Sequence, residues 1–417
     1  VGIIGSGGRE HALCYEIKKS NEVKEIYCFP GNGGTHSLAK NINLDINNFE
    51  LLKEFIIKEN INIIVIGPEK PLVDGLVDFL EKNKIKVFGP NKYAARLEGS
   101  KSFMKSICRD NKIPTAQFKI CKNKKDVHNF IKVNKLPVVV KADGLAAGKG
   151  VTICKNKKQV LKMSDEIFKG KFNTSNKLVL EEFLEGEEVS YFLVVDNKSF
   201  KFFGSAQDHK RVGEKERGPN TGGMGAYSPA PIIDKEIEIK IINKIVKPTL
   251  IALKKSGNPY TGFLYVGLMI VNNEPYLIEY NVRMGDPECQ VILPRLNSDL
   301  VQILSAATNN KLNKININWK KINCMTVVLC SKGYPGKYKK EQLIKGVSKV
   351  NVNKKSFIFH AGTKLKNNLL VSNGGRVLNI TSTGKIFNKI RKEIFKIIKI
   401  INWKDGFYRK DIGWRVI

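Results

Sequence analysis

Three polar residues that could act on a phosphoryl group lie close together at positions 279, 281 and 283. Glu279 and Asn281 are two residues apart at the end of a predicted strand, so their side chains share one face. A carboxylate and an amide oxygen placed together suit Mg²⁺. The planar guanidinium of Arg283 suits a phosphoryl or carboxylate group. The stretch therefore predicts a metal and phosphate site, although a strand followed by a solvated polar loop would carry the same residue types.

The elements that must position these residues are a hairpin and a parallel sheet. Apolar, β-prone runs at 262–271 and 275–278 flank Asn272 and Asn273, which favours two strands joined by a turn. Residues 1–90 alternate strands and helices, including a helix near 72–83, as in a parallel sheet with right-handed crossovers. Ligands bind at the carboxyl ends of the strands in such sheets.

Glycine-rich loops follow three of the predicted strands. They are Gly5-Ser6-Gly7-Gly8-Arg9, Pro30-Gly31-Asn32-Gly33-Gly34 and Gly67-Pro68-Glu69. The first loop lacks the full G-x-G-x-x-G spacing, and no acidic ribose clamp is evident, which disfavours NAD. Its backbone N–H groups at the start of a helix would suit a small phosphate ester. A tight turn without a ligand is the alternative interpretation.

A glycine-rich hairpin at 143–150 carries Lys149, and Lys141 precedes it. Such a loop can cover phosphates with backbone N–H groups and point charges. It is not a Walker loop, because no Gly-Lys-Ser/Thr and no helix follow. The next predicted strand, at 177–184, leads to Glu188. A main-chain strand edge fits adenine, and an acidic residue beside it fits ribose hydroxyls.

The composition favours a globular protein of two to four domains. Of 417 residues, 42% are hydrophobic, and no uninterrupted apolar run reaches the roughly 18 residues of a membrane span. No signal-peptide pattern is present. The eight cysteines are scattered without a C-x-x-C pair, which is typical of reduced core residues in a cytosolic compartment.

The net charge of +32 has two interpretations. It could indicate nucleic-acid binding. However, no nucleic-acid motif and no interleaving of arginine with aromatic residues accompany it. We therefore expect a general excess of lysine spread over all faces, and no specific nucleic-acid partner.

Several motifs taken together resemble a known family. The segments 140–150, 181–188 and 279–288 resemble the ATP-grasp carboxylate–amine ligases. The resemblance is narrower, to the glycinamide ribonucleotide synthetase (phosphoribosylamine–glycine ligase) family, in the segments 5–13, 205–211, 218–229, 360–363, 373–377 and 409–414. It covers essentially the whole chain. Met284 stands where this family usually has Phe, which affects packing but no ligand.

The resemblance implies a multidomain α/β and α+β protein with an ATP-grasp fold. The expected parts are an N-terminal parallel α/β substrate-phosphate domain at 1–100, an ATP-grasp core at 101–120 and 191–320, an ATP-grasp lid at 121–190, and a small C-terminal α+β domain at 321–417. The sequence pattern of this last part predicts strands near 323–329, 356–360, 370–372 and 376–381, then a helix near 388–401.

The implied activity is a carbon–nitrogen ligation in de novo purine biosynthesis. Glycine is joined to 5-phosphoribosylamine, giving glycinamide ribonucleotide, ADP and phosphate through a glycyl-phosphate intermediate. The implied cofactors are ATP and Mg²⁺ or Mn²⁺. We expect a cytoplasmic monomer with no membrane partner.

The resemblance also implies roles for individual residues. The expected catalytic residues are Arg283, Lys141, Asp208 and Lys210. The expected ATP-binding residues are Lys105, Lys141, Gly148, Lys149, Gly150, Glu181, Glu182, Phe183, Leu184 and Glu188. The expected substrate-binding residues are Gly5, Ser6, Gly7, Gly8, Arg9, Gly67, Pro68, Glu69, Asp208, Lys210, Arg211, Gly222, Gly223, Met224, Asp286, Pro287 and Glu288. Glu279 and Asn281 are the expected metal ligands. Arg376 is left open as a turn residue or a substrate contact.

Three other functions stay open at this point. A nucleic-acid-binding protein rests on charge alone, and a salt-dependent shift on DNA or RNA would support it. An NAD-dependent oxidoreductase rests on the first glycine loop. Other ATP-grasp purine enzymes, such as those that carboxylate aminoimidazole ribonucleotide, are disfavoured by the 207–211 and 221–225 segments.

Overall fold

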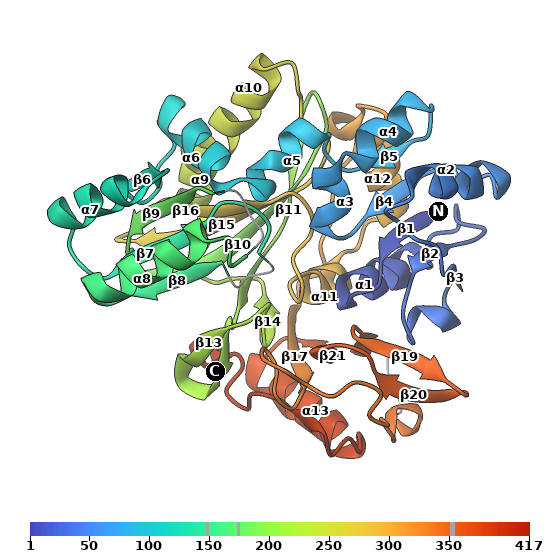
Figure 1. The fold of residues 1–417 in the computed structure, drawn as a ribbon. Coiled ribbons are helices and arrows are strands. Elements are labelled where there is room, and N and C mark those ends of the chain that lie inside the picture. Colours follow the sequence, from blue (N-terminus) through green and yellow to red (C-terminus); the bar gives the residue numbers. More distant parts are fainter. Residues whose placement is uncertain (147–149, 173–175, 351–354) are drawn as a thin grey trace.

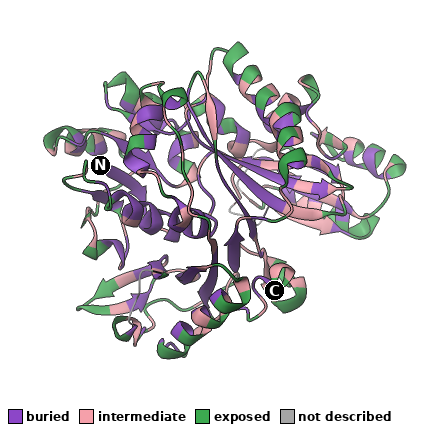
Figure 2. Ribbon diagram, turned by 180° about the vertical axis from the view of Figure 1, so that it is seen from behind, coloured by how far each residue is buried: buried purple, intermediate pink, exposed green. Residues whose placement is uncertain are grey.

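The computed structural model describes residues 1–146, 150–172, 176–350 and 355–417. An N-terminal α/β lobe, a four-stranded unit and a C-terminal lobe surround a central sheet (Figure 1). Buried residues fill the sheets and the inward faces of the helices, whereas the outward faces are exposed (Figure 2). In the described part of the chain, no helix is both long and apolar enough to cross a bilayer.

The N-terminal lobe contains a five-stranded sheet in the order β3-β2-β1-β4-β5, with every pairing parallel. Its strands are β1 (Gly2–Gly5), β2 (Tyr27–Pro30), β3 (Lys40–Asn41), β4 (Ile64–Ile66) and β5 (Val87–Phe88). Its helices are α1 (Gly8–Ile17), α2 (Phe49–Lys58), α3 (Glu69–Asp74) and α4 (Leu76–Lys82). The predicted alternation is confirmed. The helix predicted near 72–83 is two helices, because Gly75 adopts φ +97°, a left-handed conformation that ends α3.

The four-stranded unit, residues 118–182, has a core of its own. Its antiparallel sheet runs in the order β6-β9-β7-β8. The elements are β6 (Phe118–Cys121), α7 (Lys124–Val133), β7 (Val138–Ala142), β8 (Val151–Cys154), α8 (Lys157–Phe168) and β9 (Leu178–Glu182). Val127 and Phe130 on α7 and Val160 on α8 pack against the sheet. Helices α5 (Lys92–Gly99) and α6 (Lys101–Asp110) connect it to the N-terminal lobe.

The central sheet runs without a break into the C-terminal lobe, residues 321–417. The strand order is β16-β15-β10-β11-β14-β17-β21-β18, with β22 paired to β17. The strands are β10 (Glu187–Val195), β11 (Phe200–Asp208), β14 (Gly225–Ser228), β15 (Gly262–Val271), β16 (Glu274–Asn281), β17 (Asn323–Ser331), β18 (Ser356–His360), β21 (Arg376–Gly384) and β22 (Gly406–Phe407). The antiparallel pairing of β14 with β17, for example Ala226 with Thr326, makes the join.

The remaining elements cover this sheet or form its connections. They are β12 (Arg211–Gly213), β13 (Arg217–Asn220), α9 (Lys235–Ile241), a π-helical turn (Ile242–Val246), α10 (Lys247–Lys255), α11 (Cys289–Ile292), α12 (Leu300–Thr308), β19 (Thr363–Lys366), β20 (Leu369–Ser372) and α13 (Phe387–Ile400). The strands and the helix predicted for residues 323–401 are confirmed, with ends shifted by a few residues at most.

The N-terminal and C-terminal lobes meet at two buried histidines. The backbone N–H of His360, at the end of β18, donates to His11 Nδ1 on α1 at 2.7 Å. Burial and the neighbouring His360 lower the pKa of His11 to about 3. Burial lowers the pKa of His360 to about 4. Both imidazoles are therefore neutral in the folded protein throughout the mildly acidic range.

These two histidines should make the protein less stable in mild acid. Below the unfolded-state pKa of about 6.5, the two histidines bind protons in the unfolded chain, whereas they stay neutral in the folded chain. Each histidine therefore lowers the free energy of unfolding by up to about 1.4 kcal/mol per pH unit as the pH falls toward its folded pKa. We expect His11→Asn, whose amide oxygen can still accept from His360, to flatten the fall of Tm between pH 7 and pH 5. His36→Asn, at an exposed position, is the control. Equal pH profiles for wild type and His11→Asn would contradict this account.

Candidate active site

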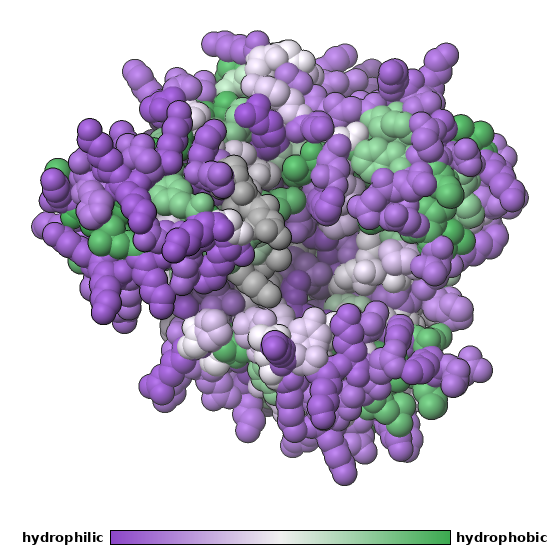
Figure 3. All heavy atoms as spheres, viewed as in Figure 1, coloured by the Kyte–Doolittle hydropathy of each residue, from purple (hydrophilic) through white to green (hydrophobic). Residues whose placement is uncertain are grey.

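A cavity of about 540 Å³ lies where the parts of the chain meet. Arg9 of the N-terminal lobe, Lys141 of the four-stranded unit, Glu279 of the central sheet and Arg376 of the C-terminal lobe all line it. Figure 3 shows the molecule hollowed near the centre of the face seen in Figure 1. The cavity is thus shared by segments that are far apart in the sequence.

Glu279 and Asn281 stand at the end of β16, and both line the cavity. Glu279 Oε1 is 3.6 Å from Lys210 Nζ. Burial alone would raise the pKa of Glu279, but Lys210, Lys141 and other nearby cations hold it below its usual range. The carboxylate is therefore ionised, as a metal ligand has to be.

The oxygen atoms of Glu279 and Asn281 fit an incomplete site for a hard divalent cation. Among the described residues, no three or more His, Cys, Asp and Glu side chains are grouped so that they could hold a metal ion by themselves. Mg²⁺ is commonly bound by one or two carboxylates and is completed by waters and substrate phosphates. One ionised carboxylate and one amide oxygen match that kind of ligand set.

Arg283 is held by two carboxylates of the N-terminal lobe. Its Nη2 lies 2.7 Å from Glu98 Oε1, and its Nε lies 3.5 Å from Glu69 Oε2. Its Nη1 donates to the carbonyl oxygen of Met284 at 3.1 Å. Burial acts to lower the pKa of Arg283, but Glu98 and Glu69 outweigh it and raise that pKa. The guanidinium plane is fixed at the wall of the cavity, and part of its donor capacity is already used.

Lys141 and Lys105 share one carboxylate. Lys141 Nζ is 2.9 Å and Lys105 Nζ is 3.2 Å from Glu181 Oε2 on β9. Burial lowers the pKa of Lys105, and Glu181 opposes this shift. Two cations beside one carboxylate leave an excess of positive charge at this wall, which suits an anionic phosphate. Lys141 lines the cavity, whereas Lys105 lies behind it.

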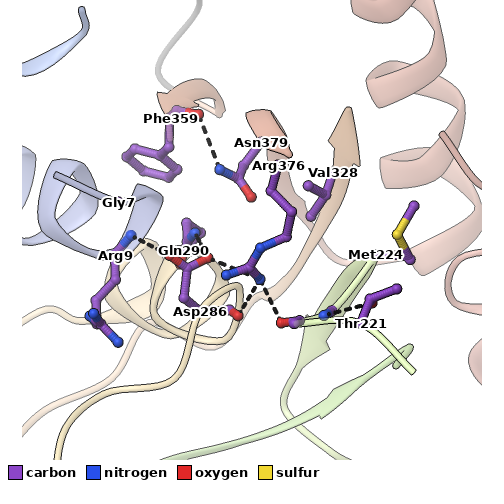
Figure 4. Close-up of polar contacts among 12 residues, drawn as sticks. Gly7, Arg9, Thr221, Met224, Asp286, Gln290, Val328, Phe359, Arg376 and Asn379 are labelled. Atoms are coloured by element: carbon purple, nitrogen blue, oxygen red, sulfur yellow. Dashed lines mark hydrogen bonds and ion pairs between the residues drawn. The ribbon is translucent and has the colours of Figure 1, made fainter. Parts of the chain in front are cut away.

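The first glycine loop is partly occupied by carboxylates of the protein. Gly7 N–H donates to Glu10 Oε2 at 2.5 Å. Arg9 N–H donates to Asp286 Oδ2 at 3.2 Å (Figure 4). A Cβ built on Gly67 would lie 1.9 Å from Glu10 Oε1, so Glu10 fills the space between the two predicted phosphate loops. Of the residues at 5–9, Arg9 is the one that lines the cavity.

Arg376 is a cavity residue and not a turn residue. It begins β21, and its Nη1 donates to the carbonyl oxygens of Gly222 and Asp286 (Figure 4). The same Nη1 is 3.4 Å from Asp286 Oδ1, and this charge helps to hold the pKa of Asp286 below its usual range against the effect of burial. Arg376 therefore ties the C-terminal lobe to two loops that form the cavity wall.

Lys210 lies between two acidic side chains of the cavity. Its Nζ contacts Glu188 Oε1 in a short ion pair and also faces Glu279. Burial would lower the pKa of Lys210, but Glu188 and other acidic neighbours raise it well above its usual value. Burial raises the pKa of the adjacent Asp208 well above its usual range.

The end of the chain holds both neighbours of Lys210. Gly413 N–H donates to His209 Nε2 at 3.1 Å, and Arg409 Nη1 donates to the carbonyl oxygen of Arg211 at 2.9 Å. Arg409 is 1% exposed and forms a two-pronged ion pair with Asp411 at 2.8 and 2.9 Å. The position of Lys210 therefore depends on residues about 200 positions later in the sequence.

The structure brings most of the expected site residues to this cavity. Those that line it are Arg9, Glu69, Lys141, Gly150, Glu181, Glu182, Phe183, Leu184, Glu188, Asp208, Lys210, Gly222, Glu279, Asn281, Arg283, Asp286 and Glu288. Those that do not line it are Gly5, Ser6, Gly7, Gly8, Gly67, Pro68, Lys105, Arg211, Gly223, Met224 and Pro287. The side chain of Arg211 turns instead to the carbonyl oxygen of Gly218. Gly148 and Lys149 lie outside the described residues.

Several lining residues were not assigned from the sequence. They are Glu98, Lys101, Asn220, Thr221, Tyr265 and Tyr334, with Arg376 left open. Glu98 and Lys101 are adjacent to helix termini in a pattern that any exposed helix could carry. No spacing signal separates them from surface residues, because their partners lie elsewhere in the chain. The Leu97–Lys101 segment would attract attention only with knowledge of those partners.

Comparisons with known proteins agree with this geometry. The phosphoribosylglycinamide synthetase family matches the chain in three parts, with its N domain over residues 1–98, its ATP-grasp (A) domain over 99–289 and its C domain over 324–415. A phosphoribosylamine–glycine ligase of Brucella melitensis is 43% identical over 416 residues, which is all of this chain and 97% of that protein. A crystal structure of the ligase with the same name from Thermotoga maritima is 33% identical, with TM-score 0.86 and coverage of 98% and 99% of the two chains. A biotin carboxylase of Campylobacter jejuni shares the fold, with TM-score 0.74, 14% identity and coverage of 98% and 93%.

The link between the end of the chain and Lys210 can be tested by a double-mutant cycle. Arg409→Lys keeps the buried charge but loses the planar fork, so Lys210 should shift and ATP turnover should fall about tenfold, or roughly 1.4 kcal/mol. If Arg409 acts through Lys210, the double variant with Lys210→Met should be no slower than Lys210→Met alone. Lys410→Met, next to Arg409 and exposed, is the matched control and should keep wild-type turnover. Losses that multiply in the double variant would show that Arg409 supports only the fold.

Proposed function

The chain belongs to the phosphoribosylglycinamide synthetase family, and we propose that the cavity described above performs its ligation through glycyl phosphate. The chain is a carbon–nitrogen ligase of purine biosynthesis, which joins glycine to 5-phosphoribosylamine at the expense of ATP. One observation carries the assignment to this cavity. The same space is lined by Lys141, which suits phosphate, by Glu279 and Asn281, which suit a metal ion, and by Arg9 of the N-terminal lobe.

The proposed chemistry has two steps. A carboxylate is a poor electrophile, so a glycine carboxylate oxygen first attacks the γ-phosphorus of ATP, and ADP leaves. The amine nitrogen of 5-phosphoribosylamine then attacks the carbonyl carbon of glycyl phosphate, inorganic phosphate leaves, and the nitrogen loses a proton. Phosphoryl transfer depends on positioning and on charge neutralisation more than on a protein nucleophile. The fixed cations of the cavity supply both.

In the proposed nucleotide subsite, Lys141 contacts the ATP phosphates, and Lys105 supports it from behind through Glu181. The loop that ends at Gly150, with Gly148 and Lys149, covers the phosphates. The main chain at 181–184 meets adenine, and Glu188 meets the ribose hydroxyls. The excess of positive charge around Glu181 supports this assignment. Both lysines contact Glu181 Oε2, whereas the buried Oε1 has no hydrogen-bond partner among the described residues, so Glu181 can meet adenine with this oxygen as well as through the strand backbone.

The proposed metal is Mg²⁺ or Mn²⁺, held by Glu279 and Asn281. When bound, it neutralises charge on the phosphates. Arg283, which lies beside this pair, would face the transferred phosphoryl group and the glycine carboxylate. The proximity of Asn281 Oδ1 to Arg283 Nη2, at 3.4 Å, supports a shared site.

The proposed acceptor subsite is built from Arg9, Glu69, Asp286 and Glu288, with Asp208 and Lys210 near the join. Arg376 belongs to this group by its contacts with Gly222 and Asp286. Since Glu10 occupies the space between the glycine loops, we assign the phosphate of 5-phosphoribosylamine to the Arg9 side of the cavity and not to the backbone of 5–8.

Acyl phosphates hydrolyse, so water has to be excluded during the reaction. We propose that the lid at 121–190 closes over the cavity, beside a substrate domain at 1–100, a core at 101–120 and 191–320, and a C-terminal domain at 321–417. The separate core of the four-stranded unit supports its movement as one body.

The eight unpaired cysteines support a reducing, cytoplasmic location. We further propose that the protein works as a monomer.

The assay for this function measures ATP consumption with glycine, with and without 5-phosphoribosylamine generated in place. ADP should form at a substantial rate only when both substrates are present. Two results would overturn the proposal. One is ADP formation with aminoimidazole ribonucleotide that yields its carboxylated product, and the other is ADP formation that does not depend on glycine.

Three substitutions test the proposed metal and phosphoryl site. Glu279→Gln keeps the shape of the side chain and removes one charge from the proposed metal site, and Asn281→Ala removes the neighbouring oxygen ligand. Both should lower turnover at least tenfold and raise the Mg²⁺ requirement. Arg283→Lys should impair turnover more than ATP binding, because it keeps the charge and loses the fork. The tenfold loss corresponds to roughly 1.4 kcal/mol of transition-state stabilisation. Turnover, Mg²⁺ dependence and Tm are measured on the same samples. Wild-type rates in all three, or losses that follow Tm, would remove these residues from the active site.

Nucleotide binding should protect the loop at 143–150. If this loop covers the phosphates, ATP should slow proteolytic cleavage within it severalfold, while cleavage at exposed sites in α2 stays unchanged. The sites and rates are read by mass spectrometry after limited proteolysis. Identical loop cleavage with and without ATP would argue against a phosphate-covering role.

A further inference from the structure

The positive charge of the protein is concentrated in the C-terminal lobe. Residues 1–100 contain 13 basic and 13 acidic residues, whereas residues 321–417 contain 22 basic and 4 acidic residues, a net charge of +18 out of +32. Basic residues thus occur in both parts, but the net positive charge is distributed unequally along the chain. A compositional bias acting everywhere would not leave one lobe neutral and another strongly basic. Such asymmetry points to a polyanionic partner.

Helix α13 turns a row of lysines outward. Lys389, Lys392, Lys396 and Lys399 are spaced three, four and three residues apart, which places them on one face of the helix, and all four are exposed. The opposite face packs into the lobe through its buried isoleucines. Glu393 is the one acidic residue in the sequence of this helix. It lies 3.6 Å from Lys396.

A neighbouring segment extends this row at the end of the helix. The segment at 345 pairs with Asn402 just beyond α13, through Lys345 N–H to Asn402 O at 3.1 Å and Asn402 N–H to Lys345 O at 2.9 Å. Lys345, Lys349 and Lys404 are all exposed. Long hydrophilic side chains project from the lower part of Figure 3, where Figure 1 places α13. We call the seven lysines at 345, 349, 389, 392, 396, 399 and 404 the α13 basic face.

The spacing and chemistry of the α13 basic face fit one kind of partner. Its helical lysines recur about every 5–6 Å along roughly 15 Å, a spacing that suits a row of regularly spaced anions. Each exposed residue from 388 to 399 is Asn or Lys. Four isoleucines of the helix are buried, and Ile400 at its last position is the one exposed apolar residue of α13, so the helix lacks the continuous apolar face that inserts into a bilayer. It also offers no aromatic anchor of the kind that dominates protein–protein interfaces.

We propose that the α13 basic face binds the phosphate backbone of nucleic acid without sequence selectivity. Phosphate contacts position a protein on nucleic acid but carry no sequence information, so this partner is compatible with the absence of a base-reading motif. The surface is built from residues that take no part in the active site, so the inference does not rest on the proposed ligation chemistry.

The test is a fluorescence-anisotropy titration of a 20-base-pair DNA duplex of mixed sequence with the full-length protein. Wild type should bind with micromolar affinity at about 0.05 M salt and weaken steeply as salt rises. Replacing Lys389, Lys392, Lys396 and Lys399 by Gln should weaken binding at least tenfold and make the log–log salt slope less steep by up to about 3.6, because each of the four phosphate contacts contributes about 0.9. ATP turnover and Tm should stay at wild-type values.

A matched variant distinguishes DNA binding by the α13 basic face from an effect of the protein's overall charge. Replacing the exposed Lys24, Lys58, Lys82 and Lys92 of the N-terminal lobe by Gln removes the same charge and should leave DNA binding within about twofold of wild type. Equal losses in both variants, or no binding by wild type at about 0.05 M salt, would overturn the proposal. So would tight binding to phosphatidylserine vesicles without binding to the duplex, which would assign the face to a membrane surface.

Discussion

Compensation of buried charge in the central cavity is the constraint on which the rest of the structure depends. Ionised groups taken out of water are costly unless partners of opposite charge meet them. Here Glu181 faces two lysines, Arg283 faces two carboxylates, and Asp286 faces Arg376. The partners of Arg283 and of Asp286 come from different lobes, whereas Lys141 and Glu181 belong to the same four-stranded unit. Undocking one lobe would leave charges buried without compensation, so the cavity and the arrangement of the lobes are maintained together.

The same pairings determine how the cavity can receive its ligands. Lys141, which is proposed to contact the phosphates, already holds Glu181, and Lys210 already holds Glu188 and Glu279. A bound nucleotide would compete with these internal carboxylates for the same cations. These cations are therefore only partly compensated by protein carboxylates, which leaves them able to attract an anionic ligand.

The continuous central sheet explains why the C-terminal lobe is part of the catalytic unit. Pairing of β14 with β17 carries the sheet into the last quarter of the chain. It brings Arg376 to the wall of the cavity, and it brings Arg409 and Gly413 to the hairpin that carries Lys210. The lobe that completes the cavity in this way also carries the α13 basic face on its outer side, so one lobe can serve two surfaces with separate chemistry.

Much of the fold follows from local pattern. Period-two and helical periodicity predicted the parallel N-terminal sheet, strand β9 of the four-stranded unit and most elements of the C-terminal lobe, because each depends on burial of one face of a local segment. The helix predicted near 72–83 failed in detail because a single left-handed glycine divides it. The join between β14 and β17 left no signal, since either strand could pair with many others.

The candidate site likewise contains some residues that the sequence indicates and others that it does not. Glu279, Asn281 and Arg283 could be chosen from the sequence alone, because a strand places alternate side chains on one face and their chemistry is distinctive. Glu98, Arg376 and Arg409 could not be chosen, and Glu10 could not be recognised as the group between the two glycine loops. Sequence determined which local segments carry reactive groups. Only the tertiary structure decided which charges meet, because Coulombic and hydrogen-bonded partners are set by distance in space and not by separation along the chain.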